Sequence, residues 1–215
     1  MTNKISSASD YRTFSDGGVP CTHHKLLPYT LRCAEGCGAN FILDIGCGNG
    51  AMANALFKPG RTIVGIDPSE VGISYARKNY PLIRFECVSI YDGHGALDAG
   101  DFDMVVATEV IEHLFYPREL LKFASAKLKP GGLLLLSTPY HGWLKNVAIA
   151  VLNAWDKHHT VLWDGGHIKF WSKRTLTQAL AEEGFECAAF HGVGRVSYLW
   201  ESMILVARKR TSAAS

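Results

Sequence analysis

The strongest constraint on the fold is a regular alternation of short apolar runs with helical patterns, which begins at residue 41. Each apolar run is long enough for one buried strand, and the segments between them show the spacing of amphipathic helices. Buried strands joined by helical crossovers form a parallel sheet with helices on both faces. The sequence therefore predicts an α/β domain. Strands are expected at 41–46, 61–67, 83–90, 102–108 and 132–138, and helices at 49–57, 69–79, 109–115 and 117–128.

The pattern changes after the fifth strand. A long excursion, residues 139–171, is not needed to build the sheet. It is followed by a helix at 172–185, which Gly184 closes, and by two final strands at 185–190 and 202–209.

No repeat or linker divides the chain. The first 20 residues are rich in Ser, Asp and Gly and are expected to be flexible or to form a loose cap. We therefore predict an N-terminal flexible or cap segment over residues 1–40 and a single domain over residues 41–215.

Composition limits the location and the partners. With 215 residues and a formal net charge of +2, the chain suits one globular domain and offers no basic field for nucleic acid. Its six cysteines form no dense framework, so a cytoplasmic, reducing location is expected. The most apolar stretch, residues 143–155, is shorter than the roughly 20 residues that a bilayer crossing needs. We expect a buried helix, a lid or a segment at a membrane surface.

The glycine-rich turn DIGCGNG, residues 44–50, points to a bound nucleotide. Glycines at a strand-to-helix turn let a ligand approach the backbone, and the next helix N-terminus adds positive potential. A dinucleotide pattern also fits, because Asp67 follows 21 positions after Gly46, as a ribose ligand would. However, a pyrophosphate would be repelled by Asp44, whereas S-adenosylmethionine brings an ammonium and a sulfonium. The turn therefore favours S-adenosylmethionine over a nicotinamide dinucleotide.

Two residues near this turn have simpler explanations as well. Asp67, Pro68 and Glu70 fit a helix start, with Asp as N-cap, Pro in the first position and Glu in the third. Cys47 suits a small packing residue better than a catalytic thiol. The capping role of Asp67 and its contact with a ribose both stay open at this point.

The stretch ATEVIEHLF, residues 107–115, places two carboxylates and an imidazole within five positions. On a helix, Glu109, Glu112 and His113 would stand at i, i+3 and i+4 and project from one face. Acids at a helix start also suit the helix dipole and need no other role. Because this helix would begin beside the glycine turn, the cluster is equally a candidate site for Mg²⁺ or Mn²⁺, or for a catalytic base.

Four motifs resemble those of class I S-adenosylmethionine-dependent methyltransferases: DIGCGNG, then GIDPS, TEVIEH and LKPGG in the same order. The resemblance implies a Rossmann-like, seven-stranded, mostly parallel sheet whose last strand is antiparallel. It also implies that the glycines pass the methionine part of the cofactor, that Asp67 binds the ribose and that Ser89 and Ile90 flank the adenine. The residues expected at the cofactor are Asp44, Gly46, Cys47, Gly48, Asp67, Pro68, Ser89, Ile90 and Thr108.

A second resemblance concerns the acidic cluster. E-x-x-E-H followed by a later H-x-K-F is similar to two families, the ubiquinone-biosynthesis O-methyltransferases and the small-RNA 3′-terminal 2′-O-methyltransferases. The first methylate catechol-type polyprenyl aromatics, and in the second two Glu and two His hold a divalent metal. The resemblance implies Glu109, Glu112, His113 and His167 as metal ligands, with Glu109, His113 and His167 as catalytic residues. Such a metal would lower the pKa of the acceptor hydroxyl.

The excursion 139–171 is expected to cover the substrate. It holds Trp143, Trp155 and Trp163 among many aliphatic residues and few Lys or Arg, which suits an apolar or aromatic acceptor. RNA would require more basic charge. We therefore expect O-methylation of a small molecule, with peripheral membrane contact through residues 143–155. The alternatives are RNA 3′-terminal 2′-O-methylation and a non-catalytic S-adenosylmethionine-binding module.

Other polar residues of the excursion have less defined roles. His141, His158 and His159 are alternative ligands or bases, although a histidine bonded to backbone or water is the simpler explanation for each. Lys145 is most simply a solvated charge on a helix.

Overall fold

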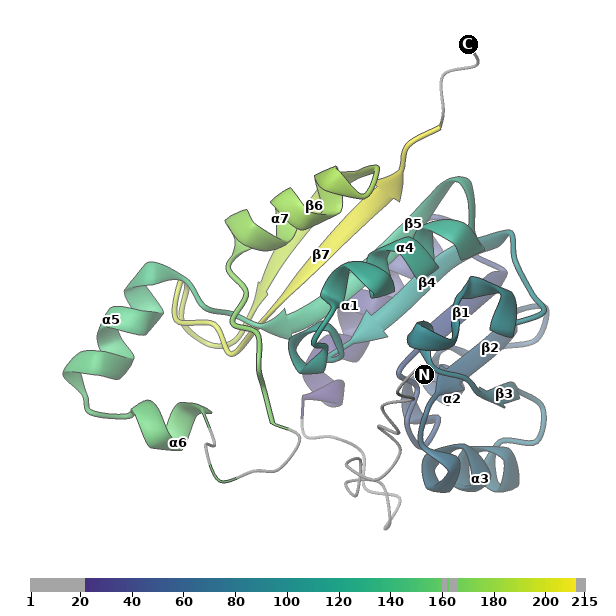
Figure 1. Cartoon of the computed structure of the whole chain (residues 1–215), viewed down its shortest axis with the longest axis horizontal. Helices are drawn as coiled ribbons and strands as arrows, with labels where there is room; N and C mark the ends of the chain where they lie inside the picture. Colours follow the sequence, from purple (N-terminus) through teal and green to yellow (C-terminus); the bar gives the residue numbers. More distant parts are fainter. Residues whose placement is uncertain (1–21, 160–161, 163–165, 212–215) are drawn as a thin grey trace, which may run out of the picture.

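The computed structural model describes residues 22–159, 162 and 166–211, apart from the side chain of Lys157 (Figure 1). Residues 1–20 and Trp163, for which a cap and a substrate contact are expected, lie outside this part of the chain. The described residues form one seven-stranded sheet in the order β3-β2-β1-β4-β5-β7-β6. The strands are β1 (Phe41–Ile45), β2 (Thr62–Asp67), β3 (Arg84–Cys87), β4 (Phe102–Thr108), β5 (Leu128–Pro139), β6 (Phe185–Val193) and β7 (Ser202–Lys209).

Strand direction confirms the predicted fold. β1 pairs in parallel with β2 and with β4, β2 pairs in parallel with β3, and β4 pairs in parallel with β5. β7 is the reversed strand and lies antiparallel between β5 and β6. This is the Rossmann-like, mostly parallel sheet expected of the class I methyltransferase fold.

Helices cover both faces of the sheet, also as predicted. Leu26, Met52 and Ile73, from three different helices, belong to the apolar core on one face. Leu121 and Leu176 belong to the core on the other face, under two further helices. The helices are α1 (His23–Gly36), α2 (Ala51–Leu56), α3 (Glu70–Asn79), α4 (Pro117–Lys127), α5 (Trp143–Val151), α6 (Trp155–His159) and α7 (Lys173–Glu182).

α1 lies in the segment for which the sequence predicted no helix. Leu26, Thr30 and Ala34 recur every four residues along it and are fully buried. The Thr30 hydroxyl donates to the Leu26 carbonyl at 3.1 Å, which satisfies the one polar group on this buried stripe. Part of the predicted segment 1–40 is therefore a packed helix, while the domain division at residue 40 stays a prediction.

The helix predicted over 109–115 is wrong. Glu109 has a left-handed backbone with φ 55°, and only a short 3-10 turn, η5 (Ile111–His113), follows it. The Glu112 carbonyl accepts hydrogen bonds from the backbone N–H groups of Ile168 and Lys169 at 2.9 and 3.0 Å. Because that carbonyl is engaged by a distant segment, an α-helical ladder does not continue through it.

The excursion 139–171 begins at the carboxyl end of β5. Figure 1 shows α5 and α6 there, set apart from the helices that cover the sheet. Trp143, Val147 and Val151 are exposed along α5, whereas Lys145 and Ile149 are buried. The expectation that Lys145 is a solvated charge is thus wrong. Among the described residues, no helix has both the length and the apolar character needed to cross a membrane.

Candidate functional site

The glycine turn lies where β1 ends. Gly46, Gly48 and Gly50 all have positive φ, between 52° and 81°, which side chains other than glycine rarely adopt. A Cβ on Gly46 would lie 2.5 Å from a methyl group of Val110, so this position has no space for a side chain either. The backbone N–H of Gly46 also donates to the Ile66 carbonyl at 2.8 Å. The turn is therefore held tightly against β2, in a backbone conformation that glycine allows at all three positions.

Asp67 braces this turn from the end of β2. Its two carboxylate oxygens accept the backbone N–H groups of Gly48 at 2.9 Å and Ser69 at 2.8 Å. The N-cap of α3 is Ser69, whose hydroxyl accepts the Gly72 N–H at 3.1 Å. The alternative in which Asp67 caps this helix is therefore wrong, and Asp67 links the two turns at which a nucleoside would lie.

Asp44 is the least satisfied carboxylate near the turn. It is 1% exposed, and its Oδ2 has no hydrogen-bond partner within the described part of the chain. Burial and, to a smaller extent, the Asp67 charge raise the pKa of its carboxyl to about 8, although the Ala53 backbone N–H acts in the opposite direction. A cationic ligand would offset this burial, because an unpaired buried charge is costly. Asp44 thus fits the ammonium and sulfonium of S-adenosylmethionine.

The remaining residues expected at the cofactor lie at the same edge of the sheet but differ in what their side chains do. The Cys47 side chain is buried in the core, where burial raises the pKa of its thiol well above the usual range. Ser89 caps a 3-10 turn, η3 (Ile90–Asp92), since its hydroxyl accepts the Tyr91 N–H at 3.2 Å. This cap ends β3 before the predicted strand 83–90 is complete. Pro68 follows β2 directly, and Thr108 is the last residue of β4.

Glu109 is held by two serines that the sequence analysis did not single out. Ser137 on β5 donates its hydroxyl to Glu109 Oε1 at 2.8 Å, and Ser202 at the start of β7 donates to Oε2 at 3.3 Å. Burial raises the pKa of the Glu109 carboxyl to about 7, although the two serines and Lys145 act in the opposite direction. Both serines stand at strand ends on the site edge, which was their only sequence signal.

Three of the four predicted metal ligands come together. Glu112, His113 and His167 each offer a ligand atom, and these atoms lie within 4.8 Å of one another. The pairing of Glu112 with the segment 168–169 brings His167 close, with its Nε2 4.0 Å from Glu112 Oε1. The His113 and His167 rings have centroids 4.9 Å apart. Glu109 is not part of this group. The four residues that were expected to bind one metal ion therefore do not form a single cluster among the described residues.

The electrostatics of this group suit a cation. Glu112 is fully buried, and neither carboxylate oxygen has a hydrogen-bond partner among the residues that the structure describes. Burial raises the pKa of its carboxyl well above the usual range, and the Glu109 charge adds to this effect. Burial lowers the pKa of His167 to about 4, with smaller contributions from His113, His159 and His158. A buried carboxylate beside a neutral imidazole is a ligand set that divalent metals accept.

A second cluster of ionisable groups lies beside this one. The His141 ring stands 5.5 Å from the His159 ring and 6.1 Å from the His158 ring, measured between centroids. Burial lowers the pKa of His141 to about 4 and that of Lys145 to about 8. Lys145 is 5% exposed, and its Nζ donates to the Glu201 carbonyl at 3.3 Å. Its position next to Glu109 and Glu201 could not be read from the local sequence.

Comparison with known proteins adds independent information. Residues 23–189 match a family described as “Methyltransferase domain”. The ubiquinone biosynthesis O-methyltransferase of Bradyrhizobium diazoefficiens is 33% identical over 151 residues, which cover 66% of this chain and 56% of that protein. The enzyme of the same name from Vibrio parahaemolyticus is 32% identical over 145 residues, with coverages of 66% and 60%. The chain therefore spans less than two thirds of the length of these curated relatives.

Solved structures show the same fold. Magnesium protoporphyrin IX methyltransferase from Synechocystis, with bound SAH, has a TM-score of 0.67 and 18% identity, and the match covers 92% of this chain and 91% of that one. An O-methyltransferase family protein from Burkholderia thailandensis has a TM-score of 0.70 and 16% identity, with coverages of 89% and 57%. At such identities the likeness concerns the fold, and it agrees with the strand order described above.

Proposed function

The chain belongs to the methyltransferase domain family that its residues 23–189 match, and on this premise we propose that it transfers a methyl group from S-adenosylmethionine to a hydroxyl of a small apolar or aromatic molecule. The names of the curated relatives support O-methylation, and catechol-type acceptors are the first class to test. The single observation that carries the proposal is a pair of buried carboxylates at one edge of the sheet, each with at least one oxygen that lacks a hydrogen-bond partner among the described residues. Asp44 faces the glycine turn, and Glu112 faces two histidines.

Asp44 and Asp67 are proposed to bind different parts of the methyl donor. Asp44 offers an unpaired carboxylate oxygen to a cation, and Asp67 holds the turn backbone beside the place of a ribose. Gly46 lets Val110 pack directly against this turn, because any side chain at position 46 would meet Val110. Since the methyl donor carries positive charge at its sulfur, this site stabilises the bound donor electrostatically.

Transfer breaks the donor's carbon–sulfur bond and forms a carbon–oxygen bond, while the acceptor hydroxyl releases its proton. We assign that proton to Glu109, whose pKa of about 7 suits a general base at neutral pH. Ser137 and Ser202 orient its carboxylate through hydrogen bonds to its two oxygens. Because these bonds engage both oxygens, we assign Glu109 the role of base and not that of a metal ligand. A divalent cation held by Glu112, His113 and His167 would polarise the acceptor hydroxyl and lower its pKa.

The acceptor is proposed to reach the site from an apolar surface. Trp143 on α5 is 77% exposed and Val151 is 78% exposed, which is unusual for large apolar side chains on one helix. These residues support peripheral contact of α5 with a membrane, from which an apolar acceptor could be drawn. The net charge of +2 gives less support to the alternative acceptor, the 3′ end of an RNA.

The test begins with the methyl donor. Calorimetry should detect S-adenosylhomocysteine binding and no binding of NAD. Transfer is then measured by mass spectrometry with 4-hexylcatechol, with its mono-phenol 4-hexylphenol and with a short RNA. The catechol should gain one methyl group, EDTA should suppress this gain, and added Mn²⁺ should restore it. Binding of NAD alone would overturn the proposal, full transfer in EDTA would remove the metal from it, and transfer to RNA alone would replace the acceptor.

A further inference from the structure

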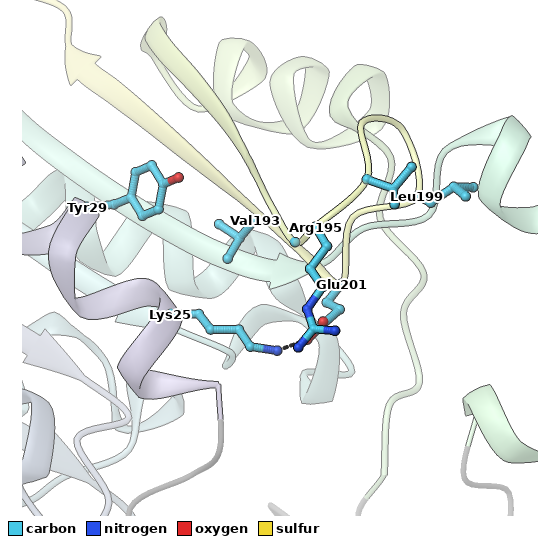
Figure 2. Close-up of a pocket in the computed structure, with 8 residues that line it drawn as sticks. Lys25, Tyr29, Val193, Arg195, Leu199 and Glu201 are labelled. Atoms are coloured by element: carbon cyan, nitrogen blue, oxygen red, sulfur yellow. Dashed lines mark hydrogen bonds and ion pairs between the residues drawn. The ribbon is translucent and has the colours of Figure 1, made fainter.

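A pocket outside the acidic cluster lies between α1 and the loop that joins β6 to β7. It measures about 490 Å³, within the range of roughly 300–1,000 Å³ that small-molecule sites occupy. Figure 2 shows two side chains reaching it from α1 and the others from the β6–β7 side. The side chains that define it are Lys25, Tyr29, Val193, Arg195, Leu199 and Glu201.

The loop on the far side of this pocket has a fixed shape. The Trp200 ring fills the space beside Gly192, where a Cβ would lie 2.0 Å from it. The same ring packs edge-on against Tyr140, with centroids 5.1 Å apart. The Glu201 N–H donates to the Val193 carbonyl at 2.9 Å and closes the base of the loop. These contacts fix the base of the loop that carries Arg195 and Leu199.

The pocket carries an excess of positive charge. It contains two cations, Lys25 and Arg195, and one anion, Glu201. Lys25 and Glu201 form an ion pair with each other, and Figure 2 shows the Arg195 guanidinium extending toward that pair. Within the described residues Arg195 itself takes part in no ion pair. The Arg195 charge is thus left for a ligand. The uncharged part of the lining includes Tyr29, Val193 and Leu199.

The pocket adjoins the acidic cluster at Glu201 and Ser202, where β7 begins. The Glu201 carbonyl accepts a hydrogen bond from the buried Lys145 ammonium, with an N–O distance of 3.3 Å. The next residue, Ser202, donates its hydroxyl to Glu109 at 3.3 Å. One short stretch of backbone therefore separates the pocket from the proposed general base.

We propose that this pocket binds a carboxylate on the acceptor, with Arg195 as the anion-binding group and Tyr29, Val193 and Leu199 around the adjoining apolar part. The proposal rests on the proposed function and specifies its substrate class: an aromatic or apolar acid that also carries a hydroxyl. A guanidinium matches a carboxylate with two parallel hydrogen bonds, which explains why an arginine is suited to this position. The amide isostere of such an acid has the same shape without the charge.

The experiment compares an acid with its amide. Calorimetry with 3,4-dihydroxybenzoate and 3,4-dihydroxybenzamide is done at pH 7 in EDTA, with S-adenosylhomocysteine present. The acid should bind at least about tenfold tighter than the amide, the effect of one charge-assisted contact. Arg195→Gln should bring the two affinities together by weakening the acid alone. Arg174→Gln, a change of an exposed arginine on α7, should leave the ratio as it is in the original protein.

Contacts that the acid and the amide share contribute equally to both affinities and do not change their ratio. A variant that folds poorly or binds catechols weakly would therefore lose both affinities, and would not lose the preference for the acid alone. Equal binding of acid and amide by the unmodified protein would overturn the proposal, as would an acid preference that survives Arg195→Gln. Binding is measured without turnover, which keeps the outcome separate from O-methylation. Methyl transfer to catechols with an affinity ratio near one would refute the pocket alone, and an acid preference without any transfer would refute only the proposed function.

Discussion

Replacing Asp44 by Asn removes one buried charge while nearly preserving the shape of the side chain. In the cofactor-free protein the Asp44 carboxyl is 1% exposed, and burial together with the Asp67 charge raises its pKa from 3.8 to about 8. At pH 7 the unfolded chain ionises this carboxyl while the folded state keeps it largely protonated, which lowers the unfolding free energy by up to about 4 kcal/mol. Since asparagine carries no charge, the Asp44→Asn protein should be more stable by about 1–4 kcal/mol at pH 8.

The sign of the pH dependence follows from proton binding. Because the pKa of Asp44 is higher in the folded state than in the unfolded chain, the folded state binds more protons between pH 4 and 8. The unfolding free energy contributed by Asp44 therefore falls as pH rises through this window. Asparagine does not titrate, so the advantage of the variant should be near zero below about pH 4 and largest above about pH 8.

Urea denaturation at pH 4, 6 and 8 measures this difference, because every other titrating group is common to both proteins. S-adenosylhomocysteine at about 100 times its dissociation constant should stabilise the original protein by about 2.7 kcal/mol. The variant should gain much less, since its side chain no longer attracts the ligand's ammonium. The cofactor should thus reverse or narrow the stability order seen without it.

Asp103→Asn is the matched control with the opposite sign. Burial raises the pKa of Asp103, but hydrogen bonds from Lys129 and from the Asn40 and Phe41 backbone outweigh this effect and lower it. This variant should lose stability, mainly above the usual carboxyl pKa. If Asp44→Asn instead destabilised the cofactor-free protein at pH 8, or bound the cofactor as the original does, the reasoning on Asp44 would be refuted.

Three further predictions concern the glycine turn, the metal-ligand candidates and α5. Gly46→Ala should abolish S-adenosylhomocysteine binding by calorimetry, whereas Gly36→Ala, where a Cβ meets nothing within 4 Å, should leave it intact. Glu112→Gln should raise the melting temperature of the metal-free protein at pH 8, because the buried carboxyl then no longer ionises, and should cancel the stabilisation by Mn²⁺. Changing both Trp143 and Val147 to Ser should reduce cosedimentation with phospholipid vesicles by about tenfold or more without lowering the melting temperature, as both side chains are exposed.

The fold could be predicted because its signals are local and repeated. The central strands β1 and β4 are short, largely apolar runs, and the turn at Gly46 lies where the first run ends, so neither signal depends on distant contacts. The strand order was not predicted, because it depends on how distant segments of the chain pair. The two final strands were expected from two apolar segments, and the antiparallel direction of the last strand came from the family resemblance and not from the residues.

The acidic cluster could be predicted only in part, because its geometry depends on contacts between distant segments. The spacing of Glu109, Glu112 and His113 suggested one helical face, yet Glu109 follows directly after β4 with a left-handed backbone and donates its N–H to the Ser137 carbonyl. The Glu112 carbonyl is bonded to the segment around Ile168, more than 50 positions later. No local propensity encodes such a pairing, and His167 was included only because of the H-x-K-F resemblance.

α5 shows how the chemistry of the site determines which face of a helix is buried. Residues two apart on an α-helix differ by about 200° in direction, so Lys145 cannot share a face with Trp143 or Val147. Burying the Lys145 ammonium against the Glu201 carbonyl and near Glu109 therefore turns the apolar stripe outward. Hydrophobic burial alone would favour the reverse orientation. The orientation of this helix is thus explained by the Lys145 charge, which the site holds inside.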